Sequence, residues 1–377
     1  MSDNNNKRKQ GQMMKIKKLL LTLAAMSIAF AGIAQDNDTA AIESNKLDAG
    51  AIIIGHIGDA HSWHILDYAD KQGVEHAVSV PLPVILINEG KVDMFMSNRF
   101  EHGHSDYKGY RLTGGGAEKE IIVCVDEDGN IKDKKPLDLS ITKTAAGLMI
   151  AVILLIVLIF AARNGYKKRG VNSPKGVQSL VEMLVVYVQD EIAKPMIGEK
   201  KYERYLPYLL TLFFFVFTCN LLGLIPLFPA GANITGNIAV TATLALITFI
   251  ITNLSGNKHY WKEIFNNPEV PAYLKIFPLM PLVELVGVFT KPIVLMIRLF
   301  ANMTAGHVIS LGFVVIIFII SNSVNMTIGG AVATPISIFF QVFMGALDCL
   351  VSYIQAYVFT TLTALYIGMA VADPEEA

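Results

Sequence analysis

The sequence is short of charge and of cysteine, and both shortages restrict what the chain can be. Only 17% of its 377 residues are charged, with a formal net charge of −1, whereas about a quarter of an ordinary globular chain is charged. A nearly neutral chain lacks the basic surface that nucleic acid requires, so we expect no nucleic-acid partner. The three cysteines, Cys124, Cys219 and Cys349, have no short spacing between them and predict neither a disulfide framework nor a zinc site. We expect no metal and no cofactor.

The missing charge is replaced by apolar residues, which make up 53% of the chain and give a mean hydropathy of +0.47. Residues 276–372 contain only four charged side chains: Glu284, Lys291, Arg298 and Asp348. Several apolar runs reach the ~18–20 residues that a helix needs to cross a bilayer. The sequence therefore predicts an all-α polytopic membrane protein rather than a soluble domain.

The N-terminus has the pattern of a secretory signal. A basic start is followed by an apolar stretch and by the small residues Gly32 and Ala34, which is the order found in signal peptides. We expect residues 1–34 to be a cleaved signal peptide, with translation beginning at Met13 or Met14.

Residues 35–143 then form a soluble segment of mixed structure, which the signal would place outside the cytoplasm. Alternating stretches such as 121–125 predict short strands. Three histidines lie near Trp63: His56, His61 and His64. They could form a metal site, but no cysteine or carboxylate completes a familiar ligand spacing. The favoured interpretation is a surface of neutral histidines.

The membrane domain, residues 144–377, contains five apolar runs, at about 144–162, 205–225, 237–254, 277–320 and 335–372. Loops 163–204 and 255–275 carry Lys and Arg, whereas loops 226–236 and 321–334 carry neither. Because basic loops stay in the cytoplasm, we expect an extracytoplasmic N-terminal segment, five passes and a cytoplasmic C-terminus. The lysines just before the first pass argue weakly against this order.

Residues 173–204 predict an amphipathic cytoplasmic helix near the membrane surface, with Leu180, Leu184 and Val185 on its apolar face. The last two apolar runs would form helices of ~65 and ~55 Å, against a hydrocarbon core of ~30 Å. We expect two long, steeply tilted helices packed as a hairpin. Re-entrant halves would also fit, although the Gly and Pro breaks typical of them are missing.

Each long helix carries one polar stripe, because a step of seven residues returns to nearly the same helical face. The first stripe has Asn302 one turn beyond three charged residues seven apart: Glu284, Lys291 and Arg298. The second includes Ser352 and three polar residues seven apart: Gln341, Asp348 and Gln355. Ionisable groups at bilayer depth are costly and by default indicate an ion path or a partner charge.

Arg298 gives the sharpest prediction, because a guanidinium cannot escape burial by losing its proton. It must face water, a counter-anion or both; a static pair with Asp348 is the structural alternative. Lys291 could instead extend to the membrane surface, and Glu284 could be an ordinary interfacial carboxylate. His307 can exchange protons near neutral pH, and with Asp348 it could form either a proton relay or a static hydrogen bond.

The stretch from Lys291-Pro292 through Arg298-Leu-x-x-Asn302-x-x-Ala-Gly306 resembles the signature of subunit a of F-type ATP synthases. Three further features reinforce the resemblance: the glutamate fourteen residues before Arg298, the pair Gln355-Ala356, and the run from Asn220 through Gly223 to Pro226. The resemblance covers about residues 144–377.

The resemblance implies a proton-channel stator subunit of the F0 sector, without catalytic activity of its own, in the cell (inner or plasma) membrane. Arg298 would face the carboxylate of the rotating subunit c ring, flanked by Asn302 and Gln355. Glu284 would belong to the cytoplasmic half-channel, and His307 with Asp348 to the outer one. Lys291 and Asn220 would have supporting roles. Implied partners are the c ring, subunit b of the peripheral stalk, the F1 sector indirectly, and membrane lipid.

Two other classes of function compete with this hypothesis. A secondary transporter would use Arg298 to bind an anionic substrate, but it predicts internal repeats and broken helices, which the sequence lacks. A purely structural scaffold leaves the aligned polar stripes without an explanation.

Overall fold

A computed structural model describes the chain in ten stretches: residues 49–69, 75–103, 105–115, 118–126, 130–132, 135–169, 173–225, 230–266, 279–324 and 326–372. All of them belong to one compact unit, Ala49–Ala377. The predicted signal peptide lies outside the described residues.

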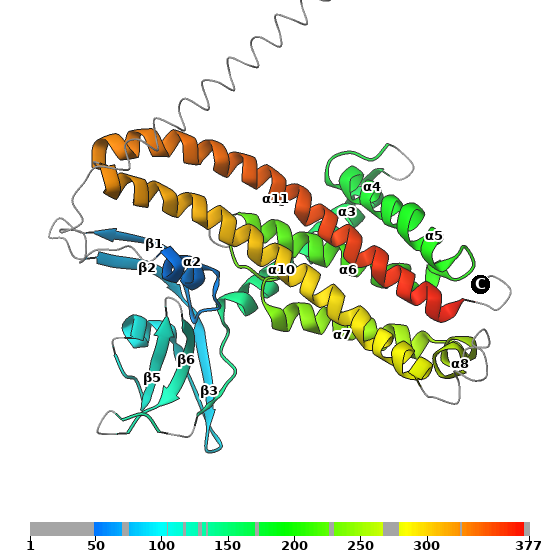
Figure 1. Ribbon diagram of the computed structural model, residues 1–377, viewed down its shortest axis with the longest axis horizontal. Helices are drawn as coiled ribbons and strands as arrows, with labels where there is room; N and C mark the ends of the chain where they lie inside the picture. Colours follow the sequence, from blue (N-terminus) through cyan, green and yellow to red (C-terminus); the bar gives the residue numbers. More distant parts are fainter. Residues whose placement is uncertain are drawn as a thin grey trace, which may run out of the picture. The chain divides into compact units, whose positions relative to one another are not determined.

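The first part of this unit, called here the β segment (residues 49–142), contains the predicted short strands. A helix is followed by three small antiparallel sheets with the strand orders β1-β2, β4-β3-β7 and β5-β6 (Figure 1). The elements are α2 (Ala49–Ile57), β1 (Ser62–Ala69), β2 (Glu75–Pro81), β3 (Pro83–Asn88), β4 (Lys91–Met96), η1 (Ser97–Gly103), β5 (Tyr110–Gly115), β6 (Glu118–Cys124) and β7 (Leu137–Asp138).

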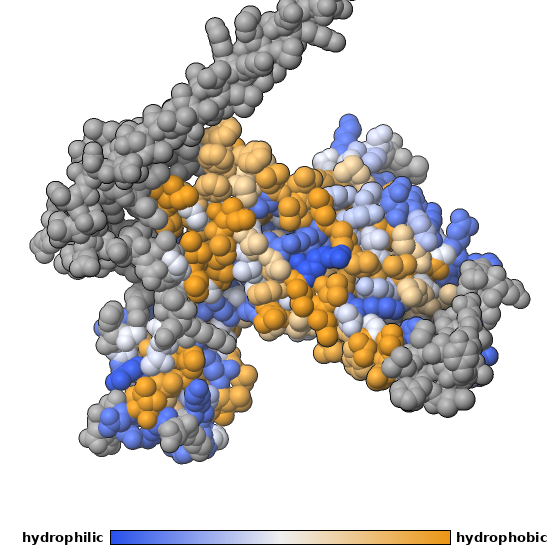
Figure 2. Space-filling view, viewed as in Figure 1, coloured by the Kyte–Doolittle hydropathy of each residue, from blue (hydrophilic) through white to orange (hydrophobic). Residues whose placement is uncertain are grey.

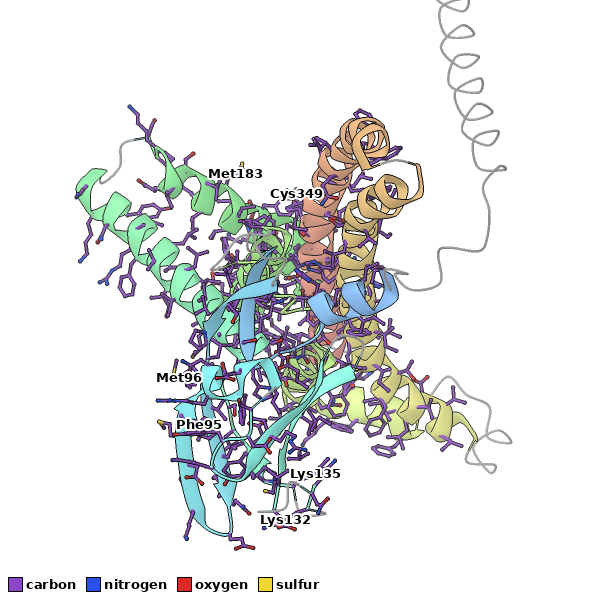
Figure 3. The ribbon with its side chains drawn as sticks, turned by 90° about the vertical axis from the view of Figure 1, so that its left-hand side faces the viewer. Phe95, Met96, Lys132, Lys135, Met183 and Cys349 are labelled. Carbon is purple, nitrogen blue, oxygen red and sulfur yellow. The ribbon has the colours of Figure 1, made fainter. Side chains whose placement is uncertain are left out.

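The β segment has a small apolar core of its own. In β3, Val84 and Leu86 are fully buried, because alternate side chains of a strand point to one face of the sheet. They pack with Phe100, Tyr110, Ile122 and Cys124. In β4, Phe95 packs against this core whereas its neighbour Met96 is exposed (Figure 3).

The rest of the chain is helical. Its elements are α3 (Lys143–Arg169), α4 (Val177–Tyr187), η2 (Val188–Ala193), α5 (Lys194–Ile197), α6 (Tyr202–Leu224), α7 (Ile238–Ser255), α8 (Lys258–Asn266), α10 (Leu279–Val324) and α11 (Met326–Val371). Four helical stretches in the described part are long and apolar enough to cross a membrane: Lys143–Lys168, Tyr202–Leu224, Ile238–Ser255 and Ile338–Val371. The chain is therefore a multi-pass membrane protein.

Helices α10 and α11 have 46 residues each, which corresponds to ~69 Å at 1.5 Å per residue. They lie side by side (Figure 1). The rings of Phe313 and Phe340 stack with centroids 5.2 Å apart, and Gln341 Nε2 donates a hydrogen bond of 2.7 Å to Ser310 Oγ.

Both helices run further than the sequence predicted. The expected polar loop, residues 321–334, is mostly helical, since α10 ends at Val324 and α11 begins at Met326. A helix satisfies its own backbone hydrogen bonds, and that gain exceeds the cost of about 1 kcal/mol for each glycine in it.

The amphipathic helix expected over residues 173–204 is divided into α4, the π-helical turn η2 and α5. Leu184 and Val185 pack against the helical core as expected, whereas Leu180 is exposed. A π-helical turn inserts an extra residue and rotates the buried face, and the buried residues within this turn are Val188, Ile192 and Ala193.

The helical core lies where α6, α10 and α11 meet. Helix α10 contributes Leu295, Leu299 and Met303, which are spaced four residues apart and buried. This spacing makes a single row along the helix, so the opposite side of α10 is left for other side chains.

Candidate functional site

Arg298 and Asn302 lie on the exposed side of α10, one turn apart. Figure 2 shows hydrophilic side chains gathered over the middle of the α10–α11 pair, with apolar surface on both sides. Arg298 makes no ion pair within the described part of the chain, so the alternative of a static pair with Asp348 is not realised. The arginine remains open to a partner outside this chain.

His307 and Asp348 lie on different helices but line one cavity of about 10 Å³, which is about the space that one water molecule requires. The lining residues are Leu224, Asn302, Met303, Gly306, His307, Asp348 and Val351. The structure thus brings together three of the predicted site residues, with Arg298 one turn away.

Two glycines make room for these side chains. A Cβ atom on Gly306 would lie 3.1 Å from a carboxylate oxygen of Asp348, and a Cβ atom on Gly223 would lie 3.2 Å from Nε2 of His307. The imidazole of His307 therefore lies where a side chain at position 223 would be, and any larger residue there would have to move it.

Nε2 of His307 is buried and has no hydrogen-bond partner in the described part of the chain. Buried polar atoms are normally satisfied by protein or by water. The cavity that His307 and Asp348 both line has room for one water, and a histidine, a water and a carboxyl group can together pass a proton.

A chain of buried hydrogen bonds supports the Asp348 turn of α11. Thr235 Oγ1 donates to Asn220 Oδ1 (2.7 Å), Asn220 Nδ2 donates to the carbonyl oxygen of Ser352 (3.4 Å), and Ser352 Oγ donates to the carbonyl oxygen of Asp348 (2.8 Å). Asn220 is fully buried. Thr235 was not predicted, because it lies in a charge-free loop whose only sequence signal is its polar pair with Asn233.

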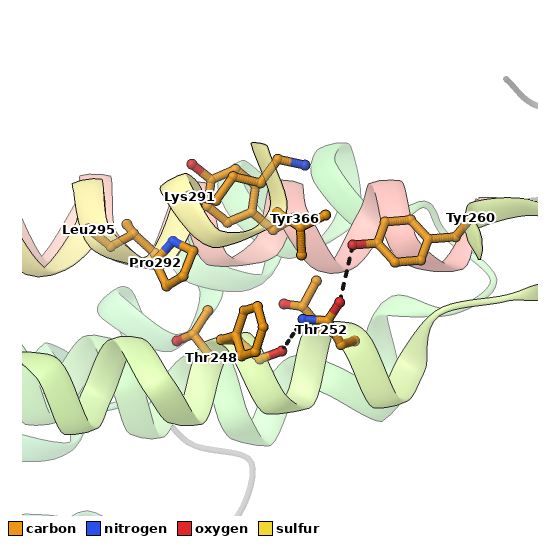
Figure 4. A pocket seen from close by; sticks show the side chains of 10 residues that line it. Thr248, Thr252, Tyr260, Lys291, Pro292, Leu295 and Tyr366 are labelled. Atoms are coloured by element: carbon orange, nitrogen blue, oxygen red, sulfur yellow. Dashed lines mark hydrogen bonds between the residues drawn. The ribbon is translucent and has the colours of Figure 1, made fainter. Parts of the chain in front are cut away.

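The remaining predicted residues lie elsewhere. Gln355 is buried on α11, and Glu284 is half-buried near the start of α10. Lys291 Nζ lies 5.3 Å from the centre of the Tyr366 ring, in a separate pocket that Thr252 and Tyr260 also line (Figure 4). The hydroxyl of Thr252 is buried without a partner among the described residues, so this second polar region also has a group that water could satisfy.

The interpretation of a surface of neutral histidines was wrong for His61. His61 is 4% exposed, and its ring nitrogens lie 2.9 Å from Asp138 Oδ2 and 3.4 Å from Glu120 Oε2. Burial lowers the pKa of His61, but the hydrogen bonds to the two carboxylates outweigh it and raise the pKa to about 9. His61 is therefore a charged, buried side chain that connects Glu120 and Asp138.

The alternative of a metal site also lacks support in the described part of the chain. The rings of His56 and His64 are 5.8 Å apart in an edge-to-face contact. No group of three or more His, Cys, Asp or Glu side chains among the described residues could hold a metal ion.

Comparison with known proteins connects this geometry to a family. A family model described as ATP synthase A chain matches residues 146–368, and one described as Domain of unknown function (DUF8433) matches residues 52–139. ATP synthase subunit a 2 of Chlorobaculum tepidum is 46% identical over 244 residues, which cover 63% of this chain and 65% of that protein.

Two further relatives agree. ATP synthase subunit a of Chloroherpeton thalassium is 41% identical over 240 residues, covering 63% of this chain and 68% of that protein. ATP synthase subunit a of Myxococcus xanthus is 41% identical over 241 residues, covering 63% of this chain and 74% of that protein. Because the first family model covers more than half of the sequence, from α3 to the last turns of α11, the chain belongs to the ATP synthase A chain family.

Proposed function

We propose that this chain is the proton-translocating stator subunit of the F0 sector of ATP synthase, and that it couples a proton gradient to ATP synthesis without catalysing a covalent step. The observation that carries the proposal is Arg298, an exposed guanidinium at the middle of an apolar helix surface that makes no ion pair with any described residue. A permanent cation in that position needs an anionic partner. The carboxylate of a rotating subunit c ring is such a partner.

Arg298 would act in two ways. It gives the ring carboxylate a counter-charge while that group passes between the two proton routes, which lowers the cost of removing the anion from water. Its own charge also repels protons, and a guanidinium cannot carry a proton onward because it does not lose one. Protons therefore reach the other side only by moving with the ring.

Two routes would lead to the ring. The outer route passes His307 and Asp348, whose shared cavity holds about one water. Glu284 would belong to the cytoplasmic route, near the start of α10. Asn302, exposed beside Arg298, and Gln355 would flank the ring contact, with Lys291 and Asn220 in support.

The proposal includes five passes, with α10 and α11 as a steeply tilted hairpin that follows the ring. A length of 46 residues per helix supports strong tilt, because a core of ~30 Å needs only about 20 residues. The β segment would lie outside the cytoplasm and the C-terminus inside it, in the bacterial inner membrane. Subunit b of the peripheral stalk would bind this chain, and the F1 sector would be connected to it only indirectly.

The substitution Arg298→Ala tests the function directly. We expect the complex to assemble but ATP-driven acidification of inverted vesicles to be lost, because the ring carboxylate loses its counter-charge. The matched control is Arg204→Ala, which removes an exposed arginine at the start of α6 and should acidify like the parent chain. Normal acidification by an assembled Arg298→Ala complex would exclude the stator role.

A further inference from the structure

The β segment is joined to α3 by a rigid connection. Strand pairing continues beyond β7, since the amide of Leu139 donates to Ile85 O (2.9 Å) and the amide of Ile141 donates to Pro83 O (3.0 Å). Helix α3 starts at Lys143, only two residues later.

The first turn of α3 is also bonded to the β segment. The amide of Lys143 donates to Ala60 O (2.8 Å), and the amide of Thr144 donates to Asp59 Oδ1 (2.9 Å). These bonds satisfy amides that a helix N-terminus leaves free. The β segment and α3 thus form one body.

The β segment also packs onto the loop between α6 and α7. Trp63, which is 3% exposed, belongs to one apolar cluster with Ala146 of α3, Cys219 of α6, and Ala232 and Ile234 of this loop. An indole buries more apolar area than almost any other side chain. Trp63 is the largest side chain of this cluster and, with Leu82, joins the β segment to the buried side chains of the loop.

This loop, residues 230–236, forms part of the wall around His307. The carbonyl oxygen of Ala232 lies 3.5 Å from the Cβ position of Gly223, the same position that His307 Nε2 approaches to 3.2 Å. Thr235, three residues on, begins the hydrogen-bond chain through Asn220 to the Asp348 turn. A shift of the loop would therefore move both sides of the His307–Asp348 cavity.

The loop also carries a buried polar group without a partner among the described residues. Asn233 is 8% exposed, and neither its amide nitrogen nor its amide oxygen has a partner within the described part of the chain. Together with Nε2 of His307, this leaves unsatisfied polar atoms on the loop and on α10. Water at such atoms is sensitive to small displacements, because it needs two to four well-placed polar neighbours.

We infer that the β segment is a working part of the outer proton route, and that Trp63 is a positioning residue. Through the apolar cluster that it shares with Ala232 and Ile234, Trp63 holds the 230–236 loop in place and so sets the shape and hydration of the His307–Asp348 cavity. This inference rests on the proposed function only in saying that the cavity conducts protons. The packing role of Trp63 does not depend on that function.

The accessibility of two native cysteines tests this inference in the assembled complex. Cys219 is 1% exposed in the Trp63 cluster, whereas Cys124 is buried in the separate core of the β segment. In Trp63→Ala, an impermeant maleimide should label Cys219 several-fold faster while Cys124 stays protected, and the proton flux–pH profile should shift. Trp63→Phe should restore both readouts in part. Labelling at each cysteine is read by peptide mass spectrometry.

The matched control is Phe100→Leu, which weakens the core of the β segment away from the loop. It should raise labelling of Cys124 but leave Cys219 and the flux profile as in the parent chain. Unchanged Cys219 labelling and an unchanged profile in Trp63→Ala would overturn the inference. So would a Phe100→Leu complex with the same flux defect, because unfolding of the segment would then explain it. A failed Arg298→Ala test would remove the proton function without changing the labelling result.

Discussion

The contact between Gly306 and Asp348 leaves no space for a methyl group. In Gly306→Ala, the new Cβ would lie 3.1 Å from the Asp348 carboxylate oxygen, so the carboxylate must move by a few tenths of an ångström. We expect slower proton flux through assembled complexes, measured by the decay of an imposed pH gradient in vesicles, and a changed dependence of that flux on external pH.

A second glycine of the same helix is the control. A Cβ on Gly312 would meet nothing within 4 Å, and alanine in a helix interior is favoured over glycine by about 0.5–1 kcal/mol. Gly312→Ala should therefore leave proton flux unchanged and stability equal or slightly higher. Equal flux in the two variants would show that the position of the Asp348 carboxylate is not critical.

At the scale of residues, the sequence indicates which side chains are functional better than it indicates which side chains lie next to them. Arg298 could be selected without coordinates, because its charge is permanent and its surroundings are apolar. The heptad spacing also placed Asp348 on a stripe of α11. Spacing within one helix does not say where a second helix lies beside it, however, so the shared cavity of His307 and Asp348 appears only in the structure.

His61 connects several elements of the β segment, since it precedes β1 and contacts Glu120 of β6 and Asp138 of β7. In the folded protein the pKa of His61 is about 9, above the ordinary 6.5. Its contribution to the stability of the fold is therefore complete below pH 6.5 and is lost as the pH rises through 9. Burial raises the pKa of Asp138, but hydrogen bonds from His61 and Ser140 outweigh it and lower the pKa from 3.8 to about 2. The contribution of Asp138 is therefore lost only as the pH falls from 3.8 through 2.

We therefore expect the β segment to be most stable between about pH 4 and 6.5 and to lose up to about 3 kcal/mol by pH 9.5, at about 1.4 kcal/mol per pKa unit. Trp63 fluorescence during urea unfolding measures this in the full chain, with Trp261→Phe removing the other tryptophan. His61→Gln should be less stable at pH 6 and nearly independent of pH from 6 to 9.5. A parent chain equally stable at both pH values would show that His61 is not charged when folded.

At the scale of elements, periodicity and length predicted the helices well and their ends poorly. The apolar runs located α3, α6, α7 and the two long helices. The Gly, Ser and Asn residues of 321–334 predicted a loop, but a helix flanked by long apolar runs continues through them. His61 was misassigned for a different reason: its partners lie 59 and 77 residues away in sequence, beyond any local pattern.

The ends of several helices gather at one side of the molecule, which bears on how often the chain crosses the membrane. Near the end of α11, the carbonyl oxygen of Val371 accepts hydrogen bonds from Lys201 Nζ (2.7 Å), just before α6, and from Asn257 Nδ2 (3.0 Å), just after α7. The start of α6, the end of α7 and the end of α11 are therefore together. An odd number of passes would put all three on the opposite side of the membrane from the β segment.

Single cysteines in a chain without Cys124, Cys219 and Cys349 would decide the number of passes. With five passes, an impermeant maleimide should label Lys135→Cys, in the β segment, from outside, and should label Lys262→Cys and Ala372→Cys only in inverted vesicles. Met326→Cys, at the first residue of α11, should react from outside, because the hairpin of α10 and α11 must then cross completely. Reaction of Met326→Cys from the cytoplasmic side alone would make the hairpin re-entrant.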